Sequence, residues 1–120
     1  MTEQEFNTLR HGDVIHHPAT PIRVWTVIGY QPHLDSFLAV RGRPYMAGQH
    51  LWLKLLRLPE SKCQELAKRS GLNITRIINP GNWLKKYDAP TFTCQICGTT
   101  TPIPHVCPVF YPELRGRDQQ

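Results

Sequence analysis

Residues 22–28 read Ile-Arg-Val-Trp-Thr-Val-Ile, and this stretch decides the expected fold class. Its side chains alternate, so that even positions fall on one face of a β-strand and odd positions on the other. Shorter strand signals occur at 14–15 and 36–41, separated from it by a proline-bounded turn at 18–21 and a loop at 29–35. Three strands so close together predict a small, strongly curved antiparallel sheet, similar to an SH3-like barrel.

The clearest helix signal covers residues 59–70. A proline begins the segment, Glu60 complements the positive end of the helix dipole, and basic residues complement the negative end. Cys63 lies on the apolar stripe of this helix and is expected in the core. The preceding residues 50–58 fit either a strand or one side of a helix, and we prefer the strand.

The chain is expected to fold as one small α+β unit with an added metal-binding segment. Its 120 residues suit one domain. We divide it into an N-terminal arm at 1–10, an α+β domain at 11–90 with one central helix, a zinc knuckle at 91–110 and a polar tail at 111–120. Prolines cluster at 80–112, which favours irregular loops there.

Positive charge concentrates in the middle of the sequence. The formal net charge is +5 and the sequence pI is about 9.3. Residues 59–90 hold six basic and three acidic side chains, whereas residues 91–120 are balanced. Such an excess suits nucleic acid or an acidic partner protein as the ligand, and ordinary solubility charge is the alternative interpretation.

The N-terminal sequence and the hydropathy pattern lead us to expect a cytoplasmic protein. Residues 1–10 are acidic and polar and lack the apolar stretch of a secretory signal. The apolar runs are too short for a transmembrane helix. In such a chain, four cysteines favour metal binding over disulfide bonds.

A metal-binding pattern lies near the C-terminus, where residues 94–107 read CQICGTTTPIPHVC. Cys94 and Cys97 form a C-x2-C pair, which allows two thiolates to bind one ion from a tight turn. His105 and Cys107 follow after seven residues and can complete a tetrahedron of three sulfurs and one nitrogen. Prolines oppose a redox-active helix here; a disulfide framework or incidental cysteines would also produce such a pattern. We predict one structural Zn²⁺, because four protein ligands leave no open position.

Residues 65–78 resemble the helix-turn-helix motif of DNA-binding regulators. The matching features are Ala67 in the first helix, Gly71 at the turn, Leu72 after it and Ile77 further on. The resemblance implies a short recognition helix that enters a DNA major groove.

That recognition helix is expected near residues 73–79. The alternative is that the helix at 59–70 ends at glycine and leads into a strand, since the β-branched residues after it are poor helix formers. The candidate partner-binding residues of this segment are Lys68, Arg69, Asn73, Thr75 and Arg76.

A second set of candidate binding residues surrounds the predicted sheet. Arg41, Arg43 and Tyr45 follow one another closely and accompany Trp25 and other aromatic residues. Aromatic and basic side chains together bind single-stranded nucleic acid by stacking and charge, or form a protein-interaction surface. Core packing is the expected role of Trp25 and Phe37, which leaves Arg41, Arg43 and Tyr45 as candidates.

The histidines do not form a recognisable catalytic set. His16 and His17, with His11 and His33 nearby, have no Glu or Asp at a supporting spacing and are expected to be exposed strand-end residues. The sequence also lacks the glycine-rich phosphate loop and the nucleophile motifs of common enzyme classes. We therefore expect a non-enzymatic protein.

Three functions fit these features, in decreasing order of support. The first is a non-enzymatic zinc-binding protein associated with nucleic acid, such as a small regulator. The second is an adaptor or inhibitor that binds another protein and uses zinc only for structure. The third is a small ribonuclease of the barrel-shaped toxin type, which rests on a Gly-Asp-Val strand start and nearby arginines.

Overall fold

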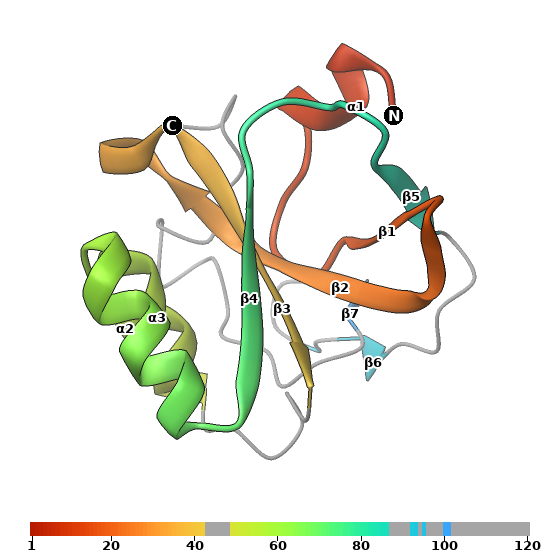
Figure 1. Ribbon diagram of the computed structural model, residues 1–120. Helices are drawn as coiled ribbons and strands as arrows, with labels where there is room; N and C mark the ends of the chain where they lie inside the picture. Colours follow the sequence, from red (N-terminus) through yellow and green to blue (C-terminus); the bar gives the residue numbers. More distant parts are fainter. Residues whose placement is uncertain (43–48, 87–91, 94, 96–99, 102–120) are drawn as a thin grey trace.

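An antiparallel sheet of five strands forms the centre of this α+β protein (Figure 1). The computed structural model describes residues 1–42, 49–86, 92–93, 95 and 100–101. The helices are α1 (Glu3–Asn7), α2 (Gln49–Arg57) and α3 (Glu60–Arg69), with a 3-10 helix, η1, at Pro32–Leu34. The strands are β1 (Val14–His17), β2 (Thr20–Gln31), β3 (Ser36–Gly42), β4 (Leu72–Ile77), β5 (Leu84–Lys86), β6 (Phe92–Thr93) and β7 (Thr100–Thr101).

The order of strands in the main sheet is β4-β3-β2-β1-β5. The first four strands form a meander, and β5 then returns to pair with the free side of β1. The pairing register shifts between Val27 and Gly29 on β2, and between His16 and His17 on β1. Because such bulges bend a strand and increase its twist, the sheet curves around its inner side chains.

One face of the sheet, here called the helix-covered face, packs against α2 and α3, which lie side by side in Figure 1. Apolar side chains from β2, β3 and β4 meet the apolar sides of both helices. The buried members of this core are Ile28, Leu38, Val40 and Leu72 from the sheet and Trp52, Leu53, Leu55, Leu56, Cys63 and Ala67 from the helices. The face is closed by this packing.

The opposite face is covered at one end by α1 and the residues that follow it. Thr2 begins the helix with a capping box: its hydroxyl accepts from the Glu5 N–H, and the Glu5 carboxylate accepts from the Thr2 N–H. Residues 1–10 thereby place Phe6 and Leu9 in a second core. Their buried partners are Ile15, Val27, Phe37, Ala39 and Ile77.

The strand preferred for residues 50–58 is wrong, because these residues belong mainly to α2. Trp52 and Leu55 are buried on one side of the helix, whereas Lys54 and Arg57 are exposed on the other. This helical period outweighs the alternation of leucines, since α3 and the sheet give the apolar side a surface to cover. The described part of the chain therefore has three α-helices and not one central helix.

The recognition helix implied by the helix-turn-helix resemblance is also wrong. The residues assigned to it form β4, which pairs with β3 without interruption from Leu72 opposite Gly42 to Ile77 opposite Phe37. The β-branched residues of this segment favour the extended conformation. Gly71 separates it from α3 with a φ of +71°, so the alternative interpretation of helix, glycine and strand is confirmed.

The other predicted elements of the main sheet are confirmed. The strands expected at 14–15, 22–28 and 36–41 correspond to β1, β2 and β3, and the helix expected at 59–70 is α3. β2 continues as far as Gln31, into a segment that was expected to be a loop.

The histidines are less exposed than predicted. His11 is 2% exposed, and its Nδ1 lies 2.9 Å from the carbonyl oxygen of Ile28. His16 and His17 are half-buried, and His33 is exposed. The expectation of exposed strand-end residues thus fails for His11, because the chain around it is hydrogen-bonded to Val27 and Ile28 of β2.

A two-stranded antiparallel sheet lies outside the main one. It consists of β6 and β7, with Phe92 opposite Thr101 and Thr93 opposite Thr100. Most of the predicted zinc knuckle and the whole polar tail lie outside the described residues. Within the described ranges, no helix is long and apolar enough to cross a membrane.

Candidate functional site

A group of aromatic, basic and polar side chains lies beyond the end of the sheet that α1 covers. The pairing of Thr26 with Val40 places Trp25 beside Arg41, and Arg41 itself pairs with Asn73 on β4. Paired residues of antiparallel strands project from the same face, and so do residues two positions apart. We call this group the Trp25 face, and its members are Trp25, Arg41, Asn73 and Thr75.

Trp25 and Arg41 form the centre of the Trp25 face. The guanidinium carbon of Arg41 lies 5.3 Å from the centre of the Trp25 ring, in a cation–π contact worth about 0.5–2 kcal/mol. Both side chains are half-buried, and Trp25 also packs against the core under α1. Among the described residues, the buried Arg41 Nε has no acceptor within hydrogen-bond distance. The pair thus holds an aromatic ring and a positive charge in contact on this face.

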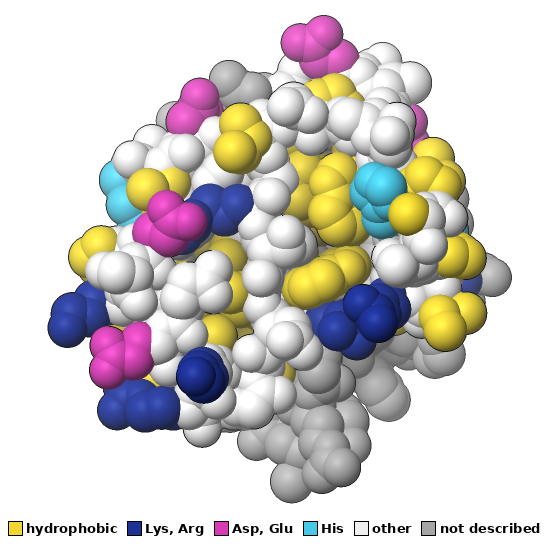
Figure 2. All heavy atoms as spheres, in the orientation of Figure 1, with side chains coloured by type: hydrophobic (Ala, Val, Ile, Leu, Met, Phe, Trp, Pro, Cys, Tyr) yellow, Lys and Arg dark blue, Asp and Glu magenta, His cyan; other side chains and the backbone are white. Residues whose placement is uncertain are grey.

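A second aromatic pair borders the same core near β5. The rings of His17 and Trp83 meet edge to face at 5.5 Å, and Trp83 packs against the core under α1. Figure 2 shows hydrophobic side chains gathered between β4 and β5, with a histidine beside them and Lys and Arg side chains below. Sequence reasoning missed Trp83. Its place on this face follows from the pairing of Lys85, two residues later, with Ile15, and no local sequence pattern reports that pairing.

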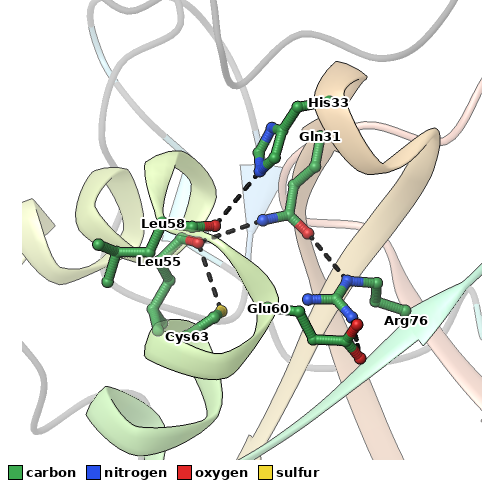
Figure 3. A network of polar contacts seen from close by, with 7 residues as sticks. All are labelled: Gln31, His33, Leu55, Leu58, Glu60, Cys63 and Arg76. Atoms are coloured by element: carbon green, nitrogen blue, oxygen red, sulfur yellow. Dashed lines mark hydrogen bonds and ion pairs between the residues drawn. The ribbon is translucent and has the colours of Figure 1, made fainter.

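Arg76 projects from the helix-covered face, away from the Trp25 face. Its Nη1 lies 2.5 Å from Oε1 of Glu60, and its Nε donates to Oε1 of Gln31 at 3.4 Å (Figure 3). The Arg76 side chain is only 14% exposed. Its positive charge is therefore paired with Glu60 of the same chain, whereas the resemblance implied that Arg76 would face DNA.

Gln31 connects β2 to the end of α2. Its Nε2 donates to the carbonyl oxygen of Leu55 at 3.2 Å (Figure 3). It also lies 3.2 Å from the carbonyl oxygen of Leu56. The helical partner of the Leu55 carbonyl would be the N–H of residue 59, but Pro59 has none. The Cys63 thiol adds a second donor to Leu55 at 3.4 Å. Together with Arg76, Gln31 therefore ties both helices to the sheet.

Lys68 and Arg69 lie exposed on α3. Lys68 borders an open groove of about 730 Å³ between α3 and β4. The residues that line the groove are Gln64, Glu65, Lys68, Gly71, Leu72, Asn73 and Ile74. Asn73 belongs to both the groove and the Trp25 face, so the groove that Lys68 borders reaches β4 beside that face.

Asp13 holds the turn that leads into β1. Its Oδ2 accepts from the Arg10 N–H at 3.0 Å and lies 3.8 Å from Nζ of Lys85. Burial raises the pKa of the Asp13 carboxyl above its ordinary value of 3.8, against the opposing effects of Lys85 and Arg10. The backbone contacts of this residue, which include the Asp13 carbonyl accepting from the Val27 N–H at 2.8 Å, indicate a structural role.

No group of three or more His, Cys, Asp or Glu side chains that could hold a metal ion occurs among the residues that the structure describes. The strands β6 and β7 pair on either side of the segment that contains the first predicted cysteine pair. The predicted site residues that lie outside the described part are Cys94, Cys97, His105, Cys107, Arg43 and Tyr45. The zinc site therefore stays a prediction.

Comparisons with known proteins give no further guide to this site. No protein family, no curated protein and no solved structure matches the chain significantly.

Proposed function

We propose that this chain is a non-enzymatic, zinc-binding protein that binds single-stranded nucleic acid through the Trp25 face of an SH3-like sheet. The observation that carries the proposal is the Arg41 guanidinium held over the Trp25 ring, with Asn73 opposite Arg41 on the next strand. A nucleic acid base can stack on an aromatic ring while its phosphate pairs with the adjacent positive charge.

Single strands fit this arrangement better than duplexes. A stacking site needs a base face that is free, and the bases of a duplex are stacked on one another. The predicted duplex-reading element was a helix at 73–79, whereas β4 occupies most of that segment. Asn73 and Thr75 offer hydrogen-bonding groups on β4, on the other side of β3 from the ring, and Lys68 adds a positive charge to the groove beside β4.

The non-enzymatic part of the proposal is supported by the use of the polar residues in packing. Asp13, the acidic residue of the Gly-Asp-Val strand start, binds the Arg10 N–H and lies near Lys85. Gln31 and Arg76 bind the ends of helices.

The zinc ion is proposed for Cys94, Cys97, His105 and Cys107. The pairing of β6 with β7 brings together the chain on both sides of Cys94 and Cys97, as a two-thiolate turn requires. The ion would be structural, with a contribution to the folding of residues 91–110.

Fluorescence anisotropy tests the nucleic-acid proposal, with single-stranded and duplex probes of random sequence in a series of salt concentrations. We expect tighter binding of single strands and a linear decrease of log affinity with log salt. Arg41→Gln should weaken binding and reduce the salt slope by about one. Trp25→Ala should weaken single-strand binding by about tenfold, since one stacked base contributes about 1–3 kcal/mol.

The matched control is Lys62→Gln, which removes the same charge from an exposed position on α3. It should leave the affinity within about twofold of the original protein, because Lys62 is not a member of the Trp25 face and lies at the opposite end of α3 from Lys68. Equal losses for Arg41→Gln and Lys62→Gln would indicate nonspecific charge attraction. Absence of binding at low salt would refute the proposal and favour the protein-binding adaptor.

The zinc proposal is tested by metal content per chain after purification. Cys97→Ser should lose the ion, because three ligands hold zinc far less tightly than four. Cys63→Ala is the matched control, since Cys63 is a buried core residue of α3. Zinc retained in full by Cys97→Ser would contradict the proposed ligand set.

A further inference from the structure

The two edge strands of the main sheet differ in how well they are protected against pairing with a strand of another molecule. β5 is a three-residue edge with lysines at two of its positions, Lys85 and Lys86. Short length and lysine side chains are common devices that prevent an edge from pairing with another strand. β4, at the other edge, has six residues, contains no proline or lysine, and pairs with β3 without a bulge. Its single charged side chain, Arg76, is bound to Glu60.

The outer side of β4 is open in the described structure. No backbone hydrogen bond joins residues 72–77 to any described residue outside their pairing with β3. β4 stands in front of the other strands in Figure 1, and no described segment crosses it. In Figure 2, the surface along β4 is formed mainly by backbone and uncharged polar side chains. The strand thus offers a row of donors and acceptors to another strand.

We infer that β4 pairs antiparallel with β4 of a second copy of this chain, about a two-fold axis perpendicular to the sheet. An axis of this kind maps each face of the sheet onto itself, so a residue on the axis must face its own copy. With Thr75 on the axis, Thr75 lies opposite Thr75, a favourable cross-strand pair. The same register places Leu72 of one copy opposite Ile78 of the other.

Two features of the surface favour a second copy as the occupant. Ile78, which follows β4, is 69% exposed, and the proposed register would cover it. The groove beside the strand carries one acidic and one basic residue, Glu65 and Lys68, so that two copies would bring both signs of charge together. An edge with charges of only one sign would instead repel the same edge of a second copy.

The dimer does not depend on nucleic-acid binding. It would, however, change how many binding sites the protein offers to a nucleic acid. Because the axis preserves the faces, the Trp25 faces of both copies would lie on the same side of one continuous sheet. A dimer would therefore present two stacking sites to one strand of nucleic acid.

Sedimentation velocity of the full chain, without nucleic acid and over a range of concentrations, tests the inference. We expect a concentration-dependent dimer. Thr75→Lys would place two ammonium groups against each other on the axis and should raise the dimer dissociation constant by about tenfold or more. Asn82→Lys is the control, because it adds the same charge at an exposed turn outside the strand. A monomer at all concentrations would overturn the inference.

Cross-linking separates this dimer from one that uses another surface. Cβ atoms directly opposite each other in antiparallel strands lie about 4.5–5.5 Å apart, which is close to disulfide geometry. Under mild oxidation, Thr75→Cys should form a covalent dimer much faster than Asn82→Cys. Equal rates for these two variants would also overturn the inference, and this readout remains valid if Thr75→Lys does not fold.

Discussion

The two faces of the main sheet hold tryptophans in opposite situations. Trp52 of α2 is completely buried on the helix-covered face, where two helices close the core. Trp25 of β2 is half-buried on the opposite face, where α1 covers only one end and Arg41 lies over the exposed ring. A tryptophan on this sheet is therefore accessible to solvent only where the covering layer ends.

The largest expected effect is on the free energy of unfolding, which substitution of the two tryptophans should lower by different amounts. Trp52→Ala should lower the free energy of unfolding by about 3–5 kcal/mol, because it leaves a large cavity in a closed core. Trp25→Ala should lower it by only about 1 kcal/mol, since solvent already reaches the side chain. Urea denaturation followed by circular dichroism measures both values.

This comparison would break if the two substitutions cost the same. Equal losses would mean that Trp25 is a core residue in solution and that its contact with Arg41 is part of the packing. The affinity loss predicted for Trp25→Ala would then have a structural cause.

A smaller effect tests what joins the helices to the sheet. Gln31→Ala should lower the free energy of unfolding by about 1–3 kcal/mol, because it removes a donor from the Leu55 carbonyl and an acceptor from Arg76. Glu60→Gln should cost less than about 1 kcal/mol, since the Glu60 side chain is 63% exposed. A larger loss for Glu60→Gln than for Gln31→Ala would show that the ion pair dominates.

The smallest effect concerns the end of the sheet under α1 and depends on pH. Burial raises the pKa of Asp13, so the folded protein binds a proton more tightly than the unfolded chain does. Stability relative to Asp13→Asn should therefore fall as the pH rises from below 3.8 through the raised folded value, and then stay constant. Denaturation of both proteins from below pH 3.8 up to neutral pH checks this sign. A relative stability that increases over this range would show that Lys85 and the Arg10 N–H outweigh burial.

The strands of the fold were predictable because alternation at 22–28 reports a local property of the backbone. Helix α2 was not predictable from the sequence, because the residues around Trp52 fit both the period of a strand and the period of a helix. Only the contact of the apolar side with α3 and the sheet decides between them. The failure of the helix-turn-helix interpretation has a similar cause. The motif fits α3 and Gly71, but the pairing of β4 with β3 joins residues that are distant in sequence.

The candidate site was partly predictable. Arg41 was selected by residue type, and the pairing of β3 with β4 brings it together with Asn73 and Thr75, which were selected through the helix-turn-helix resemblance. Arg76 was selected on the same grounds but projects from the other face, because a single step along a strand reverses the direction of the side chain. Trp83 was overlooked, since its position depends on the late return of β5.

The return of β5 to β1 also has a consequence for the order of folding. Every other pairing of the main sheet joins strands that are neighbours in the sequence, whereas this one joins Val14 to Lys86. Pairings that close long loops form slowly, because the chain entropy is lost before the contact is gained. On the ribosome, β1 to β4 and the three described α-helices are synthesised before β5, so the edge of β1 that does not pair with β2 stays unpaired until β5 is made.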